Sequence, residues 1–326
     1  MTESLLQLRD LRVTFDTPTG PARAVRGIDL DVLAGEAVAV VGESGSGKSV
    51  TMLATLGLLQ GAHVTGSAMY RGTELIGAPT AQLRSVRGAK ISIVFQDPMT
   101  SLNPVLTIGR QLEMVMRAHE PGLTKRTARA RSISLLDQVA IAQAERRVDS
   151  YPHELSGGMR QRVMIAMAIA NGPEVLIADE PTTALDVTVQ AQIMDLLATL
   201  QRDRALALVL ITHDLGVVAD AADRIAVMYA GRVVENGPVG SVFADPGHPY
   251  TRGLLACLPR LDRRDAVQAA IPGVPPSPVA LPPGCPFAPR CPLAVPACTE
   301  LEPVLARYRA GEVACSVVAH SEAVAT

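Results

Sequence analysis

Short hydrophobic runs of strand length alternate with stretches of helical periodicity along most of this chain. The apolar runs have the composition of buried parallel strands and fall at 37–41, 91–95, 175–178 and 208–211. Helical spacing of apolar residues follows or separates them, at 48–59, 108–119, 124–139 and 187–201. This alternation predicts an α/β fold with a mostly parallel central sheet.

The pattern changes in two places and predicts further parts. Residues 98–159 are dominated by helical periodicity, which indicates a helical insertion. β-rich runs on both sides of Gly231 predict a hairpin, at which we expect the sheet to end. Dense prolines after Ser241 break any long helix and indicate a small appended domain that is held by something other than a large core. We expect a core of 1–97 and 160–240, a helical subdomain of 98–159, and an extension of 241–326.

Composition narrows the class of protein. The chain has 326 residues, enough for one large or two modest domains, and its 48% hydrophobic content is ample for a buried core. A net charge of −2 provides no basic surplus, so no nucleic-acid partner is predicted. No apolar run approaches the roughly 20 residues that cross a bilayer, and the N-terminus lacks an export signal, so a cytoplasmic protein is expected.

A glycine-rich segment between the first predicted strand and helix has the Walker A pattern of phosphate-binding loops. Its residues are Gly42, Glu43, Ser44, Gly45, Ser46, Gly47, Lys48 and Ser49. The backbone amides of such a loop wrap a β-phosphate, Lys48 would neutralise phosphate oxygens, and the Ser49 hydroxyl would ligate Mg²⁺.

A second glycine motif opens the helix predicted after Met159. Gly157 and Gly158 allow backbone N–H groups to approach a phosphate closely, and the positive end of the following helix favours an anion. The alternative is an ordinary helix start, in which Ser156 is the N-cap and the glycines form a turn.

Two acidic residues directly follow the predicted strand at 175–178. Asp179 would hold Mg²⁺ and Glu180 would polarise an attacking water, although two acids after a strand are also common in solvated loops. His213 follows another predicted strand, where a lone histidine is more often structural. Phe15 lies in a β-rich run, where a core position is nearly as well supported as contact with a ligand.

Together with Gln96, these motifs occur in the order found in the ABC ATPases, which the chain therefore resembles from residue 15 to residue 213. The resemblance implies a P-loop NTPase fold with a mostly parallel core, an antiparallel β subdomain, a helical subdomain and a Cys/Pro-rich extension. It implies catalysis by Glu180, His213, Gln96 and Lys48. The implied ATP-binding residues are Phe15, Gly42, Glu43, Ser44, Gly45, Ser46, Gly47, Lys48, Ser49, Val50, Gln96, Asp179 and His213. Mg²⁺ would be held by Ser49, Gln96 and Asp179. The signature residues Leu155, Ser156, Gly157, Gly158 and Met159 would contact the nucleotide of a second ATPase subunit.

Two further segments, 95–104 and 246–255, resemble the ATP-binding subunits of dipeptide/oligopeptide permeases, and nickel importers share them. This resemblance implies an ATPase at the cytoplasmic face of the membrane that powers peptide import. The implied partners are a homologous ATPase, two transmembrane permease subunits and an extracytoplasmic substrate-binding protein. The alternatives are an importer of nickel or another small solute, and a soluble complex such as carbon-phosphorus lyase.

Four of the five cysteines fall late in the chain, and we expect them to hold metal. Cys257 stands apart on an apolar segment and is expected to be buried; the others are Cys285, Cys291, Cys298 and Cys315. In a reducing compartment four thiolates favour an iron-sulfur cluster or zinc over disulfides, with unligated thiols as the remaining alternative. Zinc is disfavoured because the usual two-residue spacing is absent. The run Cys-Pro-Phe-Ala-Pro-Arg-Cys-Pro resembles tails of peptide-permease ATPases, some of which carry a four-iron four-sulfur cluster, and we expect such a cluster in a structural role.

Overall fold

The structure, a computed structural model, describes residues 4–183, 185–258 and 270–318, and within them the chain packs as two compact units. As far as they are described, residues 1–5, 33–36 and 78–211 make up the first unit. Residues 6–32, 37–77 and 212–326 make up the second. Among the described residues, no helix is both long and apolar enough to span a bilayer. The finer division predicted from the sequence stays a prediction.

Parallel strands form the centre of the first unit. Strand β6 (Ile91–Val94) pairs with β7 (Val175–Asp179), and β7 pairs with β8 (Ala207–Thr212), all in parallel. Every residue of β7 and β8 is buried, as expected for strands that are covered on both faces. The parallel strands predicted from the three apolar runs are therefore confirmed.

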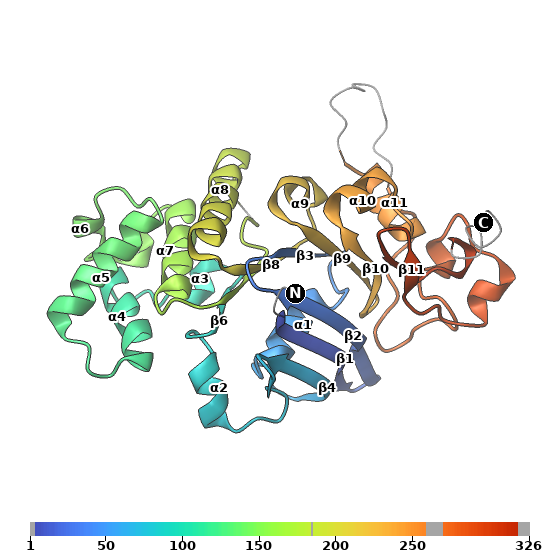
Figure 1. The fold of residues 1–326 in the computed structure, drawn as a ribbon, viewed down its shortest axis with the longest axis horizontal. Coiled ribbons are helices and arrows are strands. Elements are labelled where there is room, and N and C mark those ends of the chain that lie inside the picture. The colour runs from blue at the N-terminus through green and yellow to red at the C-terminus, as the bar shows by residue number, and fades with distance from the viewer. Residues whose placement is uncertain (1–3, 184, 259–269, 319–326) are drawn as a thin grey trace. The chain divides into compact units, whose positions relative to one another are not determined.

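The helices of the first unit begin mostly at residues with a capping side chain. Thr107 caps α4 (Ile108–His119), Thr124 caps α5 (Lys125–Gln138), and Asp186 caps α8 (Val187–Arg204). The other elements are α2 (Thr80–Val86), α3 (Pro98–Ser101), α6 (Ala144–Arg147), the 3₁₀ turn η1 (Pro152–Glu154) and α7 (Gly157–Ile169). Helices α4, α5 and α7 pack on one another, and α4 and α5 are the helices predicted at 108–119 and 124–139 (Figure 1).

The second unit contains an antiparallel sheet of four strands in the order β2-β1-β4-β5. These strands are β1 (Ser4–Thr17), β2 (Gly20–Leu33), β4 (Ala62–Tyr70) and β5 (Thr73–Glu74). The register of β1 against β4 runs from Leu6 opposite Tyr70 to Phe15 opposite Ala62. This sheet is the antiparallel β subdomain that the family resemblance implied.

The phosphate loop of the second unit joins β3 (Ala37–Val41) to α1 (Lys48–Thr55). Strand β3 is parallel to β9 (Arg224–Tyr229), which forms the predicted hairpin with β10 (Arg232–Pro238). We expected the sheet to end at this hairpin, and that prediction is wrong. Strand β12 (Gly311–Val313) pairs with β10, and β11 (Ala306–Tyr308) pairs with β12. Strands of three residues are too short to show an alternating pattern in the sequence.

The C-terminal extension shares a hydrophobic core with the rest of the second unit. Helices α9 (Leu215–Ala221) and α10 (Val239–Ala244) lead into the extension. Its further helical elements are α11 (Pro249–Ala256), η2 (Ala288–Arg290) and η3 (Pro296–Thr299). Tyr250 and Phe287 lie in one buried cluster with Val41, Val227 and Tyr229, so the expectation of an extension held without a large core was wrong. Cys257, expected to be buried, is only half-buried.

Candidate functional site

Lys48 and two glycines without room for a side chain shape the phosphate loop. Lys48 is 5% exposed, and its Nζ donates to the carbonyl oxygens of Gly42 at 2.7 Å and Glu43 at 3.0 Å. A Cβ on Gly42 would lie 2.2 Å from the Met228 carbonyl oxygen, and one on Gly47 would lie 2.5 Å from the Ala24 carbonyl oxygen. The loop therefore depends on the absence of side chains at both positions.

The outer part of the loop offers hydrogen-bond donors. Ser44 and Gly45 are exposed. Ser46 is 4% exposed, and its buried hydroxyl oxygen has no hydrogen-bond partner among the described residues. A buried hydroxyl without a partner is costly, and a phosphate oxygen would satisfy it. The loop also precedes the N-terminus of α1, whose dipole favours an anion.

Glu43, the second residue of the loop, is held by side chains from the C-terminal extension. Its backbone N–H donates to the Tyr250 hydroxyl at 2.8 Å. Its carboxylate accepts two hydrogen bonds from the guanidinium of Arg290, at 2.7 and 2.9 Å. The bond to Glu43 and the neighbouring Tyr229 hydroxyl hold the pKa of Arg290 above its usual range, against the opposing effect of burial.

In the first unit, the structure brings Gln96 and Glu180 together. The Gln96 side-chain amide donates to Oε2 of Glu180 at 2.9 Å, and the Thr183 hydroxyl donates to the same oxygen at 2.9 Å. Glu180 has a φ of 46°, a left-handed conformation that costs a residue with a side chain roughly 1 kcal/mol. The bond from its N–H to the Ile211 carbonyl at 2.9 Å helps to hold this conformation, which is typical of functional positions.

The other predicted site residues are divided between the two units. Asp179 ends β7 and is 6% exposed, and it belongs with Gln96 and Glu180 to the first unit. Phe15, residues 42–50 and His213 belong to the second unit, where His213 is exposed and Phe15 is half-buried on β1. Ala184, next to Thr183 in the motif after Glu180, lies outside the described residues.

The signature segment forms the N-terminus of α7. Ser156 is the N-cap, and its Oγ accepts the Met159 N–H at 3.3 Å. Ser156 and Gly157 are exposed, whereas a Cβ on Gly158 would lie 2.6 Å from Cγ1 of Val189. Ordinary capping by Ser156 is therefore real, and it leaves an exposed helix N-terminus that is compatible with anion binding.

The four late cysteines line one cavity of the extension, together with His248 and Phe287. Burial raises the pKa of the Cys285 and Cys291 thiols, and the nearby Cys298 and Cys315 add to this effect. Within residues 4–183, 185–258 and 270–318, no group of three or more His, Cys, Asp or Glu has the arrangement that holds a single metal ion.

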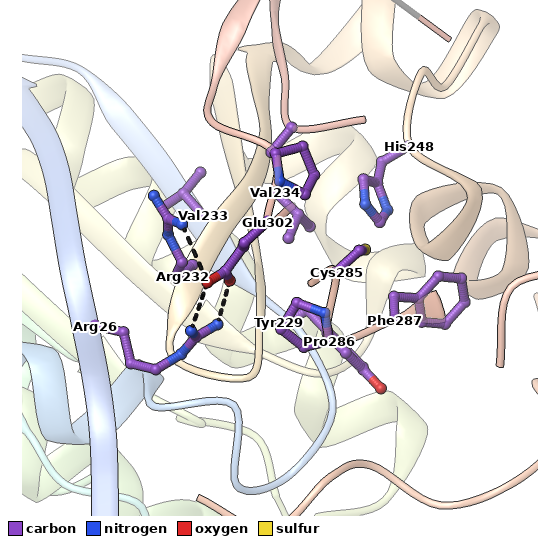
Figure 2. A pocket seen from close by; sticks show the side chains of 12 residues that line it. Arg26, Tyr229, Arg232, Val233, Val234, His248, Cys285, Pro286, Phe287 and Glu302 are labelled. Carbon is purple, nitrogen blue, oxygen red and sulfur yellow. Dashed lines mark hydrogen bonds and ion pairs between the residues drawn. The ribbon is translucent and has the colours of Figure 1, made fainter. Parts of the chain in front are cut away.

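Ion pairs in a neighbouring pocket attach this cysteine segment to the sheets of the second unit. Figure 2 shows the carboxylate of Glu302 between the guanidinium groups of Arg26 and Arg232, with Cys285 lining the same pocket. Arg26 donates to Glu302 at 2.6 and 2.9 Å, and its side chain is 11% exposed. A half-buried, bidentate pair of this kind fixes the extension more firmly than an exposed ion pair would.

Comparison with known proteins assigns the chain to a family. A family model described as "ABC transporter" matches residues 25–183, and one described as "Oligopeptide/dipeptide transporter, C-terminal region" matches residues 234–298. The oligopeptide transport ATP-binding protein OppD of Salmonella typhimurium is 52% identical over 301 residues, which cover 92% of this chain and 90% of that protein. The chain belongs to the ABC transporter ATP-binding proteins of the oligopeptide/dipeptide type. As an ABC protein of this kind, it is an ATPase.

Other relatives of this ABC ATPase agree with the assignment. OppD of Escherichia coli is 50% identical over 303 residues, covering 93% of this chain and 90% of that protein. The dimeric, post-hydrolysis structure of the ATP-binding cassette MJ0796 bound to ADP and Pi matches with a TM-score of 0.65 and 29% identity, over 72% of this chain and 98% of that one. The predicted P-loop ABC fold is therefore confirmed.

Tyr250 and Arg290 contact the phosphate loop of this ABC ATPase, and neither contact was predicted from the sequence. Both lie in segments that carry the family resemblance, at 246–255 and 285–292. Neither role leaves a signal in the sequence, because the burial of Arg290 cannot be read from a proline-rich segment.

Proposed function

We propose that this chain is the ATP-hydrolysing subunit of an importer of di- and oligopeptides, bound peripherally at the cytoplasmic face of the membrane. The observation that carries the proposal is the match to relatives named for oligopeptide transport over about nine tenths of both chains, including the C-terminal region. That region favours peptides over nickel or another small solute, and a transporter over a soluble complex.

We propose nucleotide-binding roles for the phosphate loop, which follows β3, and for residues that follow β6 or end β7. The loop 42–49 binds the phosphates, with Lys48 against the β/γ oxygens and the Ser46 hydroxyl as a further donor. Ser49, Asp179 and Gln96 supply the hydroxyl, carboxylate and amide oxygens that Mg²⁺ prefers. Val50 extends the loop into α1, and Phe15 lies against the adenine.

Hydrolysis requires a base and charge stabilisation. Glu180 accepts a proton from the attacking water, and the amide of Gln96 and the hydroxyl of Thr183 orient its carboxylate. His213 contacts the γ-phosphate. The left-handed backbone of Glu180 supports this role because strained residues gather at functional sites.

Two ATPase subunits make one working unit in this proposal. The N-terminus of α7 is exposed at Ser156 and Gly157, and it contacts the nucleotide held by the partner ATPase. Leu155, which is buried, and Gly158 and Met159, which are partly exposed, complete this signature. The dimeric form of the solved cassette MJ0796 supports this arrangement. The two ATPases act on two transmembrane permease subunits, which receive peptide from an extracytoplasmic binding protein.

We propose a four-iron four-sulfur cluster at the cysteine cavity. The residues fit this group because four thiols line one cavity, and each iron of such a cluster takes its own thiolate. Ligands of a cluster surround a volume, whereas ligands of zinc converge on one ion. When bound, the cluster would cross-link the segment from Cys285 to Cys315 and so stabilise the fold of the extension.

Reconstitution with the cognate permease subunits and binding protein tests the transport proposal. The ATPase rate should rise when the binding protein is loaded with di- or oligopeptides and should not respond to Ni²⁺. Stimulation by Ni²⁺ alone, or hydrolysis by a complex that contains no membrane subunit, would contradict the proposal.

A further inference from the structure

We propose that Arg290 is a positioning residue for ATP: it holds the phosphate loop in its binding conformation through Glu43. This inference rests on the proposed nucleotide site and adds a residue of the cysteine-rich extension to it. The two residues are 247 positions apart in the chain, and both lie in the second unit.

The geometry of the pair is that of a strong, fixed interaction. Arg290 and Glu43 form two parallel hydrogen bonds, at 2.7 and 2.9 Å, and the Arg290 side chain is only 4% exposed. Bidentate arginine-carboxylate pairs are directional as well as strong, and burial removes the screening that weakens surface pairs.

The guanidinium is itself anchored on several sides. Its Nε donates to the Pro272 carbonyl at 2.9 Å, and an Nη donates to the Tyr229 hydroxyl at 3.3 Å. Its central carbon lies 5.8 Å from the ring centre of Tyr229 and 5.9 Å from that of Phe287. Arg290 therefore has little freedom to move, and its two hydrogen bonds restrict the position of the Glu43 carboxylate.

A second contact holds the backbone of the same loop residue. The Tyr250 hydroxyl accepts the Glu43 N–H at 2.8 Å, and Tyr250 is fully buried between Tyr229 and Phe287, with ring centres 4.6 and 5.4 Å away. Burial raises the pKa of the Tyr250 hydroxyl, so this group stays neutral at physiological pH. Glu43 is thus fixed by its side chain and by its backbone.

Fixing Glu43 fixes the groups that bind phosphate. The Glu43 carbonyl accepts from Lys48 at 3.0 Å and from the Ser46 N–H at 3.2 Å, so both groups depend on the position of this residue. A loop that already has its binding conformation loses less entropy when ATP binds. Loss of the pair should therefore weaken ATP binding more than it slows the chemical step.

The pair also joins the loop to the cysteine segment. Arg290 ends η2 and directly precedes Cys291, and the η2 turn is built on hydrogen bonds from Ala288 to the Cys285 carbonyl and from Cys291 to the Ala288 carbonyl. Any change that opens the turn between Cys285 and Cys291 displaces Arg290, so ATP affinity reports on the state of this segment.

The test is the Kd of the full-length chain for a fluorescent ATP analogue with Mg²⁺, together with KM and kcat of the assembled complex. Arg290→Met and Glu43→Gln should each raise Kd and KM on the order of tenfold, from the loss of a charged hydrogen-bond pair, with kcat largely retained. Because the two changes break one interaction, the double variant should be no worse than the poorer single variant. Arg290→Lys should recover part of the affinity.

The matched control is Arg129→Met, which breaks an exposed bidentate pair with Asp149 at 2.6 and 2.7 Å and should leave Kd unchanged. If Arg290→Met does not fold, Glu43→Gln still tests the pair, since it keeps Arg290 on its aromatic neighbours. Wild-type Kd in Glu43→Gln, or additive effects in the double variant, would overturn the proposal. Lys48→Ala tells a failure of the proposed nucleotide site from a failure of the proposed role of Arg290. If Lys48→Ala leaves ATP binding intact, the nucleotide site itself is wrong. If Lys48→Ala abolishes binding and Glu43→Gln has no effect, only the role of Arg290 is refuted.

Discussion

The side-chain amide of Gln96 donates a hydrogen bond to Oε2 of Glu180 across 2.9 Å. The two residues are 84 positions apart, but they follow adjacent parallel strands in which Val94 lies opposite Ala178. Strands that run in parallel deliver their following residues to the same edge of the sheet. A carboxylate and an amide that are far apart in the sequence thus meet at one edge of the sheet.

Glu180→Gln should abolish hydrolysis while leaving ATP binding intact. Removal of a general base costs on the order of 10²- to 10⁴-fold in rate, and the amide can still accept the bonds from Gln96 and Thr183. The measurements are kcat of the complex and Kd for the ATP analogue. Glu174→Gln, at an exposed ion pair with Lys90, is the control and should retain kcat. A Glu180→Gln variant that keeps a wild-type kcat would show that another residue acts as the base.

Substitutions at Ser156 separate its capping role from its proposed role at the partner's nucleotide. Ser156→Asp keeps a good N-cap, so the melting temperature of the isolated chain should change little. The added negative charge faces the partner's phosphates, and ATPase activity of the complex should fall at least tenfold. Ser156→Ala should instead lower stability by about 1 kcal/mol. Full activity of the complex with Ser156→Asp would mean that this helix end does not contact nucleotide.

Gly42→Ala should distort the phosphate loop and weaken ATP binding, while the rest of the fold stays intact. The new Cβ would lie 2.2 Å from the Met228 carbonyl oxygen and 2.9 Å from the Ser46 hydroxyl oxygen, so the loop must shift. We expect ATP binding by the full-length chain to fall by tenfold or more. Gly72→Ala is the matched control, because Gly72 also has a positive φ but has open space around its Cβ position. Equal loss of ATP binding in both variants would point to general destabilisation instead.

Substitution of the late cysteines should remove the proposed metal group. Anaerobically purified wild-type chain should absorb near roughly 400 nm and contain iron, as expected for thiolate-bound clusters. Cys291→Ser and Cys298→Ser should lose most of this absorbance and iron. Cys257→Ser is the control and should retain both, since Cys257 does not line the cavity. A colourless wild-type protein with one zinc per chain would contradict the cluster.

The part of the fold that depends on local pattern could be predicted from the sequence. Helix α4 has the predicted ends at Ile108 and His119, because a threonine cap and a regular apolar face mark it. Lys48, Asp179 and Glu180 could be proposed as site residues because each lies in a contiguous sequence motif.

The rest depends on contacts between distant residues. Pairing of Glu235 with Val313 adds a strand to the sheet, and burial of Phe287 joins the extension to the core, but neither leaves a periodic signal. The pair between Arg290 and Glu43 is of the same kind. Charge complementarity across 247 residues cannot be recognised without the fold that brings the two together.

The most direct test of the proposed function is uptake of a labelled oligopeptide into proteoliposomes that contain the two permease subunits and both ATPases, with the binding protein outside and Mg-ATP inside. Wild-type complex should accumulate peptide only with ATP, and Glu180→Gln should stop accumulation while the complex still binds ATP. Peptide uptake that continues at the wild-type rate with Glu180→Gln would contradict the account.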